Sequence, residues 1–527
     1  MDRTAATQIP LSYRDWPGTF RPEEVGLAPL EFVEKFGSHM PGGGIGDDEE
    51  AETVDYFMRW MVSGKLEVNC LGCHDAEPSY DQAEYAAQVG RQNFRWAATA
   101  ASGLATVSGS AENMPDTYDV LFGSMLDDPK QIPPSVSYDE SRFDDGGKVF
   151  FDVVRDIRAE RCYFCHSSKT IPATPSERWE TDEDIHMVAG MTCVDCHRNG
   201  LDHAMIRGYE GEALSVDNPF AATLTCRGCH LGDGSAGFPM AGRLGSPQPE
   251  HAGIPPVHFD KLTCTSCHTG PWPDRKNYLV KTSKAHRLGT RGVLKADDAL
   301  PHILSPVFIK QEDGKIAPHR LIWPAFWAYL DGEDITPLDP QVVASLAGRI
   351  ITRGEPLRAG AFPTLTDEQI VQVLGLLPPP PSADGAPVYI SGGKLFRLDG
   401  SGELMQADHP AAQPYSWAFA HDVRPAAQSL GVRGCGDCHA TDSPFYFGRI
   451  DVDSPVATLQ GSFITMTDFL HMGTVYPRIF ALSFVFRPWL KLLVLAAFAM
   501  MAAVLIVYGF KGLSRLLEVV AGAGKQT

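Results

Sequence analysis

Basic residues are scarce in this chain of 527 residues. Lysine and arginine together number 45, against 65 aspartate and glutamate residues, so the formal net charge is −20. This balance argues against nucleic acid or an anionic membrane surface as a ligand, because both would repel an acidic protein. A basic or weakly charged protein partner is more compatible with such a chain.

Long apolar runs are also scarce, and a single one lies near the C-terminus. Leu492–Phe510 contains no charged residue, and a helix of this length would span about 28 Å, close to the thickness of a bilayer core. Aromatic and cationic residues flank the run on both sides, as is typical of the two membrane interfaces. We therefore predict a transmembrane anchor over residues 485–515 and a cytoplasmic tail over residues 516–527. A buried core helix is the alternative.

No cysteine lies outside one repeated pattern. All 12 cysteines belong to Cys-x-x-Cys-His motifs, numbered here one to six in chain order. Zinc half-sites or a redox dithiol would not need a histidine after every pair, and a disulfide framework would not explain the histidines either. The motifs are Cys70–His74, Cys162–His166, Cys193–His197, Cys226–His230, Cys264–His268 and Cys435–His439.

This motif is the attachment signature of c-type haem. The two thiols add to the two vinyl groups of one porphyrin, and the adjoining histidine becomes the proximal ligand of the iron. We therefore predict six covalently bound haem c groups. The linking cysteines would be Cys70, Cys73, Cys162, Cys165, Cys193, Cys196, Cys226, Cys229, Cys264, Cys267, Cys435 and Cys438, and the proximal ligands His74, His166, His197, His230, His268 and His439.

Enough histidines remain to supply a second, distal ligand to every iron. Seventeen histidines less the six of the motifs leave eleven, and bis-histidine ligation would give low potentials and no open position. For each candidate, a hydrogen bond to a propionate or a surface role is the alternative, and a methionine could replace a histidine. The preferred distal set is His186, His203, His251, His258, His286 and His421, with His302, His319 and His39 behind it.

Two observations guide this choice. His186 and His258 each lie shortly before a motif, the third and the fifth respectively. His203 follows His197 too closely to reach the opposite face of the same iron, so we expect it to serve a neighbouring haem.

The high content of glycine and proline, 50 and 40 residues, favours loops and short helices over large sheets. We expect a mainly α and coil fold wrapped around the haems, with a small β element near residues 388–398 and one C-terminal transmembrane helix. The expected regions are residues 1–154 with haem 1, 155–290 with a tetrahaem core of haems 2 to 5, a spacer at 291–384, and 385–484 with haem 6.

Local patterns add three predictions. Tyr80–Ala101 has the spacing of apolar residues expected of a helix. Thr366 and Gln369 form a capping box that begins another helix. The aromatic block of Trp323, Phe326, Trp327 and Tyr329 should pack against porphyrin or core.

Two segments resemble known cytochromes. His258–Thr263 before the fifth motif, with the supply of extra histidines, resembles multihaem c-type cytochromes of the nitrite reductase and octahaem tetrathionate reductase superfamily. Tyr415–Asp422, with the C-terminal helix, resembles membrane-anchored multihaem cytochromes that work beside cytochrome b or quinone-reactive subunits. The likeness covers residues 60–300 and 385–510. It implies distal histidines from elsewhere in the chain and stacked haem pairs, but no Cys-x-x-Cys-Lys motif of the nitrite reductases is present.

These features lead to one functional expectation with two alternatives. We expect an electron carrier in the bacterial cytoplasmic membrane, with its haem domain on the periplasmic face, that connects a cytochrome b or quinone-reactive subunit to a periplasmic acceptor. The first alternative is a reductase or dehydrogenase that acts on a small nitrogen or sulfur compound at a haem with an open position. The second is an architectural subunit of a respiratory complex.

Export is a condition of this expectation. Residues 1–18 show no basic region followed by an apolar core, so no secretory signal is visible there. The sequence therefore leaves the route of export open.

Overall fold

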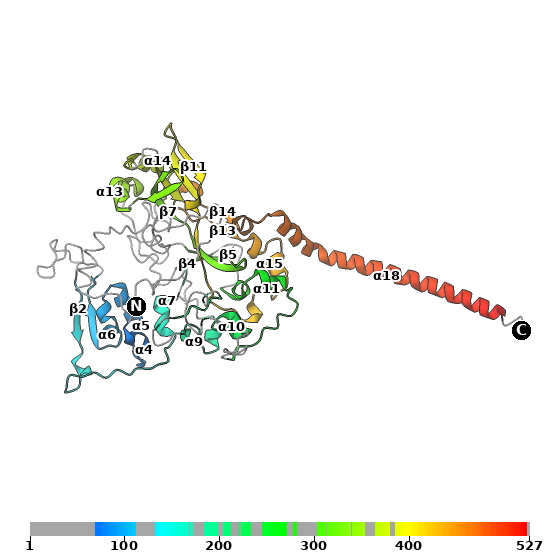
Figure 1. Ribbon diagram of the computed structural model, residues 1–527, viewed down its shortest axis with the longest axis horizontal. Helices are drawn as coiled ribbons and strands as arrows, with labels where there is room; N and C mark the ends of the chain where they lie inside the picture. Colours follow the sequence, from blue (N-terminus) through cyan, green and yellow to red (C-terminus); the bar gives the residue numbers. More distant parts are fainter. Residues whose placement is uncertain are drawn as a thin grey trace.

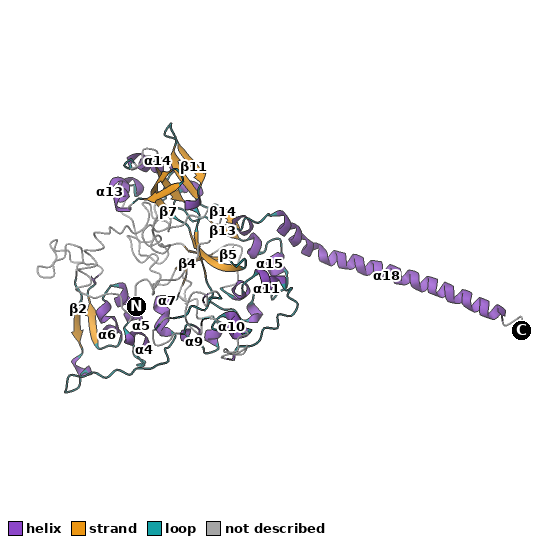
Figure 2. Ribbon diagram, viewed as in Figure 1, coloured by secondary structure: helices purple, strands orange, loops and turns teal. Residues whose placement is uncertain are grey.

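The protein is a mixture of helices and strands from which one long C-terminal helix projects (Figures 1 and 2). The computed structural model describes residues 69–111, 132–167, 169–171, 184–198, 203, 205–210, 212, 221, 223–232, 245–270, 278–281, 303–311, 313–338, 340–353, 364–379 and 385–523. The prediction of mainly helix and coil was wrong about the sheets, because two five-stranded sheets are present. Several of their strands fall in residues 291–384, the region expected to be a spacer.

The first motif belongs to a small N-terminal unit. Its helices α5 and α6 replace the single helix predicted over Tyr80–Ala101, because the chain turns at Gln92, whose φ is +60°. Tyr80 and Tyr85 are buried here against the alanines of α6. The elements are α4 (Cys70–His74), α5 (Gln82–Gly90), η2 (Phe94–Trp96), α6 (Ala97–Ala101) and the hairpin of β1 (Ala105–Ser108) and β2 (Ser135–Tyr138), followed by η4 (Glu140–Arg142).

Short helices carry the other motifs and the segments before them. They lie one after another across the body of the molecule toward the base of the C-terminal helix (Figure 1). Their bounds are α7 (Glu160–His166), α8 (Ile185–Val188), α9 (Cys193–Cys196), α10 (Cys226–His230), α11 (Val257–Lys261), α12 (Cys264–His268) and α15 (Gly436–His439).

The first large sheet joins chain segments that follow the second and fifth motifs and precede the sixth. Its order is β12-β6-β5-β4-β3, and all its pairs are antiparallel. A bulge between Leu304 and Val307 accommodates Pro306 within β5, since proline cannot donate to the ladder. The strands are β3 (Lys169–Ile171), β4 (Tyr278–Lys281), β5 (Ile303–Lys310), β6 (Ile316–Ile322) and β12 (Tyr415–Ala418).

The second large sheet has the order β11-β10-β9-β7-β8 and packs against α13 (Pro340–Ile351) and α14 (Asp367–Leu376). The hairpin expected near residues 388–398 is confirmed as β9 and β10, and the capping box at the start of α14 is also confirmed. The strands of this second sheet are β7 (Ala325–Asp331), β8 (Asp334–Pro337), β9 (Ala386–Ser391), β10 (Lys394–Leu398) and β11 (Leu404–Asp408).

The aromatic block predicted to pack against porphyrin or core lies in the protein core. Trp323, Phe326 and Trp327 are fully buried, and Trp327 packs against Tyr389 with ring centres 4.3 Å apart. Tyr329 packs at the edge of the same cluster.

Small elements close the body around the sixth motif. Phe445, Ile450 and Met466 from these elements share a core cluster with strands β5 and β6. The elements are η9 (Pro410–Ala412), η10 (Ala426–Gln428), α16 (Pro444–Phe447), β13 (Arg449–Asp451), η11 (Ala457–Leu459), β14 (Phe463–Thr465) and α17 (Met466–Phe469).

The predicted C-terminal apolar helix is confirmed, and it is much longer than the apolar run. Helix α18 extends from Val475 to Ala523, and its 49 residues correspond to about 74 Å. It is long and apolar enough to cross a membrane, and none of its most apolar segment is buried against the rest of the protein. About a third of the helix therefore precedes Leu492, and in this part Pro477 and Ala481 are buried.

Candidate functional site

Each motif forms a single helical turn. A helix places residues i, i+3 and i+4 on one face, so both thiols and the histidine of a motif point to the same side. In motif one the three residues are Cys70, Cys73 and His74 of α4. All 12 cysteines lie in described residues, none of them forms a disulfide, and each is at least partly exposed.

Polar side chains cap several of these turns. Asn69 accepts a hydrogen bond from the amide of Leu71 before motif one, and Thr225 accepts one from the amide of Gly228 in motif four. At motif three, Thr192 and Asp195 form a capping box. These caps satisfy amides that a short helix leaves unpaired, so the local sequence itself favours the turn.

Five motif histidines each face a second histidine. The two rings of each pair have their centres 5.9–6.3 Å apart. Five of the six residues in the preferred distal set are the second members of these pairs. The pairs are His74 with His203, His197 with His421, His230 with His186, His268 with His251, and His439 with His258.

This spacing matches what one iron ion would require. An imidazole nitrogen binds a first-row metal ion at about 2 Å, and the ring centre lies about 1 Å behind that nitrogen. Two histidines on opposite faces of one iron therefore have ring centres about 6 Å apart. The residues present fit a haem iron between the two rings of each pair.

Hydrogen bonds hold the outer nitrogen of most motif histidines. Nδ1 of His74 lies 2.8 Å from the carbonyl oxygen of Val154, and Nδ1 of His197 lies 3.0 Å from that of Ile206. His230 and His268 make the same contact with the carbonyls of Pro247 and Arg424, at 2.8 and 3.2 Å. A donor at Nδ1 leaves Nε2 as the metal-binding nitrogen and fixes the plane of the ring.

Two of the second histidines contact a carboxylate instead. Oδ1 of Asp184 lies 3.2 Å from Nδ1 of His186, and its Oδ2 lies 3.8 Å from Nδ1 of His421. Burial alone would raise the pKa of Asp184, but these histidines and the amide of Val423 hold it well below its usual value. Sequence analysis missed this residue, although an aspartate directly before an Ile-His helix start is a recognisable N-cap.

Burial also keeps several motif histidines in the neutral form. It lowers the pKa of His197 to about 4, with a further contribution from His421. Burial likewise lowers the pKa of His268 and His439. Neutral imidazole is the form that binds a metal ion, so these rings are ready to bind at neutral pH.

Two of the second histidines, and the residue after a third, have a left-handed backbone conformation. His203 and His251 have φ values of +59° and +44°, and Asp422, next to His421, has φ +26°. Residues with a side chain rarely adopt this left-handed conformation, and it costs about 1 kcal/mol or more. Such strain persists where the surrounding structure holds a residue in place.

Thiols of the second and third motifs lie close together, as do thiols of the fourth and fifth motifs. The thiol of Cys193 lies against that of Cys162, which raises the pKa of Cys162, and the thiol of Cys264 raises that of Cys226 in the same way. Cys267 and Cys438 belong to one apolar cluster.

Motifs one and two also lie near each other, and so do motifs three and four. Burial raises the pKa of Tyr85 to about 12, and the nearby thiols of Cys73 and Cys165 add to the rise. Burial raises the pKa of Cys196 to about 11, with a further contribution from Cys229. Each motif therefore lies near the next one in chain order, and the motif helices follow one another across the body as a line from one to six (Figure 1).

The last motif of this line lies against the long helix. The ring of His439 is 4.8 Å from that of Phe480 and 5.8 Å from that of Phe484, measured between centres. The guanidinium of Arg487 lies 3.6 Å from the centre of the Phe484 ring. Aromatic side chains of α18 therefore connect motif six to the segment that enters the apolar run. Their spacing of four residues could have suggested this face.

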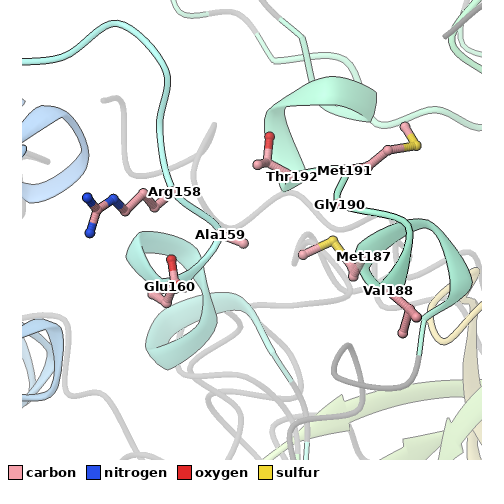
Figure 3. Close-up of a pocket in the computed structure, with 8 residues that line it drawn as sticks. All are labelled: Arg158, Ala159, Glu160, Met187, Val188, Gly190, Met191 and Thr192. Atoms are coloured by element: carbon pink, nitrogen blue, oxygen red, sulfur yellow. The ribbon is translucent and has the colours of Figure 1, made fainter.

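A cavity of about 490 Å³ opens between the approach to motif two and the turn before motif three (Figure 3). This volume is within the range of small-molecule and cofactor sites. Its position beside both motifs suits a porphyrin edge. The lining residues are Arg158, Ala159, Glu160, Met187, Val188, Gly190, Met191 and Thr192.

The remaining candidates are placed as follows. His286, His302 and His39 lie outside the described residues. His319 is fully buried in β6, with Nδ1 2.9 Å from the carbonyl oxygen of Ala317.

The packing of motif one against Tyr85 requires a glycine at position 72, and a substitution there tests this packing. A Cβ atom at Gly72 would lie 2.8 Å from the ring of Tyr85, closer than real contacts allow. Gly72→Ala should destabilise the N-terminal unit by about 1–3 kcal/mol through overpacking, measured as a lower midpoint of thermal unfolding. Gly436→Ala in motif six is the matched control, because nothing lies within 4 Å of the Cβ position there. Equal unfolding of both variants would contradict this packing.

Comparison with known proteins gives no family. Neither protein-family models nor curated proteins nor solved structures match this chain. Its function must therefore be argued from the motifs and the geometry of the described residues.

Proposed function

We propose that this chain is a membrane-anchored hexahaem c-type cytochrome that carries electrons. It would connect a quinone-reactive or cytochrome b subunit in the bacterial cytoplasmic membrane to an acceptor on the periplasmic face. The observation that carries the proposal is the set of five motif histidines that each face a second histidine at about 6 Å. The resemblance of His258–Thr263 and the histidine supply to the nitrite reductase and octahaem tetrathionate reductase superfamily remains part of this proposal.

Haem iron would supply one-electron chemistry by changing between its ferrous and ferric states. The protein residues would hold each site closed and in a fixed orientation. At the five paired sites, two histidines per iron would leave no position for a substrate, and the hydrogen bonds at Nδ1 fix four of the motif rings. Such closed sites suit electron transfer better than catalysis.

The order of the motifs supports a conduit with two different ends. Motif six lies against Phe480 and Phe484 of the long helix, and motif one lies at the other end of the line of motifs. A donor or acceptor in the membrane would therefore exchange electrons with site six. The soluble partner would exchange them with a site farther along the line.

The attachment sites also cross-link the fold. The partner of His197 is His421, which is more than 200 residues away in the chain, and the partner of His439 is His258. Iron bound between such histidines would contribute to stability, because a metal bound by the folded state adds its binding energy to folding.

The test is the mass of the denatured chain. The full-length protein, purified from detergent-solubilised membranes, should keep six iron-porphyrin groups through denaturation and have no cysteine that reacts with an alkylating reagent. The double variant Cys435→Ala/Cys438→Ala is the control and should keep five. A chain without porphyrin mass would overturn the proposal. Disulfides between close thiols such as Cys162 and Cys193, in place of bound porphyrin, would overturn it as well.

A further inference from the structure

Asp184 ties together two parts of the chain that are far apart in sequence. Its side chain caps α8, where Oδ1 accepts a hydrogen bond from the amide of His186 at 2.9 Å. Its Oδ2 accepts one from the amide of Val423 at 2.8 Å. The residue is 3% exposed, so this carboxylate is a buried anchor between α8 and the segment before motif six.

The same carboxylate lies behind two histidine pairs. His186, whose Nδ1 lies 3.2 Å from Oδ1, faces His230 of motif four. His421, whose Nδ1 lies 3.8 Å from Oδ2, faces His197 of motif three. One negative charge therefore stands behind the second histidine of two neighbouring sites.

The other outer nitrogens whose contacts are described lie against backbone carbonyls. Nδ1 of His258 lies 3.1 Å from the carbonyl oxygen of Pro255, and the motif histidines described above also face backbone carbonyls. A carbonyl is a neutral dipole, whereas a carboxylate carries a full charge and raises the basicity of the ligand more strongly. Among the pairs whose outer contacts are described, sites three and four are the ones with a carboxylate behind the second histidine.

We propose that Asp184 is a positioning residue that orients His186 and His421 together and lowers the reduction potentials of haem sites three and four as a pair. This inference rests on the proposed function, in which both histidines bind iron. The physical reason is that the oxidised site carries one more positive charge than the reduced site. A buried negative charge close to both ligands therefore stabilises the oxidised form of each.

Asp184→Asn tests the inference, because the amide keeps an oxygen acceptor and removes the charge. In a redox titration of the full-length protein, two of the six potentials should rise. The expected size is about a tenfold change in the reduction equilibrium, or about 59 mV for one electron. His186→Met and His421→Met identify the two sites, because a methionine ligand raises the potential of its own haem.

Three further variants make the result decisive. Asp184→Glu retains the charge and should shift both potentials less than the amide does. Asp399→Asn removes the same charge in the turn between β10 and β11, where Asp399 accepts from the amides of Ser401 and Glu403, and should shift neither. If Asp184→Asn does not accumulate, Asp184→Ser replaces it with the same expected rise.

The outcomes separate this inference from the proposed function. If Asp184→Asn and Asp184→Ser keep six haems and all six potentials are unchanged, the role of Asp184 is overturned. The proposed function as a cytochrome would still stand. A rise confined to one site, or spread equally over all six, would also overturn it. Absence of covalent porphyrin in the wild-type chain would instead remove the proposed function itself.

Discussion

Replacing Cys435 and Cys438 with alanine should stop electron transfer between the membrane and the other five sites. Motif six is the one that contacts Phe480 and Phe484 of the long helix, so its loss would leave a gap between the membrane and motif five. In native membranes supplied with a respiratory substrate, the rate at which haem c absorbance is reduced should fall at least tenfold. Dithionite, which reaches every site directly, should still reduce the five remaining haems.

The matched control removes the opposite end of the line. Cys70→Ala/Cys73→Ala deletes one haem as well, but it should leave reduction from the membrane at close to the normal rate. It should instead slow the transfer to a soluble acceptor if that acceptor docks at site one. Normal reduction of the motif-six variant from the membrane would contradict the proposed order of sites.

Removing the second histidine of site one should open its iron to added ligands. The rings of His203 and His74 are 6.3 Å apart, and alanine at position 203 would leave one axial position free. Purified His203→Ala should show one high-spin haem in six by electron paramagnetic resonance, and that haem should bind cyanide. The wild-type protein should show neither property.

The control for this experiment is His409→Ala. His409 accepts a hydrogen bond from the amide of Ala411 at the start of η9, and its loss should leave the spectra unchanged. A fully low-spin spectrum in His203→Ala would contradict the pairing with His74. Cyanide binding by the wild-type chain would favour the alternative of a reductase or dehydrogenase with an open haem.

The fold was predicted well where the signals were local. The capping box at Thr366 and the hairpin β9–β10 depend on residues within a few positions of one another. The sheets were missed because their strands include prolines, such as Pro306 and Pro318, which usually indicate loops. Pro306 is accommodated by the bulge in β5, and such an arrangement cannot be read from a single strand.

The predicted helix over Tyr80–Ala101 shows the same limit. Its apolar spacing is helical, but the chain turns at Gln92 and continues as α6. Asn93 donates to Gln88 and to the carbonyl of Gly109, so contacts with the following hairpin stabilise the break. Tertiary hydrogen bonds therefore overrode the periodicity.

The sequence by itself determined the covalent chemistry expected of this protein, because the two thiols and the histidine of each motif act within one helical turn. It also determined the apolar run of the C-terminal helix, since length and composition suffice for a span. The tertiary structure alone decided which histidine faces which motif, because partners such as His197 and His421 are brought together by the folding of distant segments. It also decided that Asp184 stands behind two pairs and that motif six lies against α18. Those contacts depend on long-range packing, which no spacing along the chain encodes.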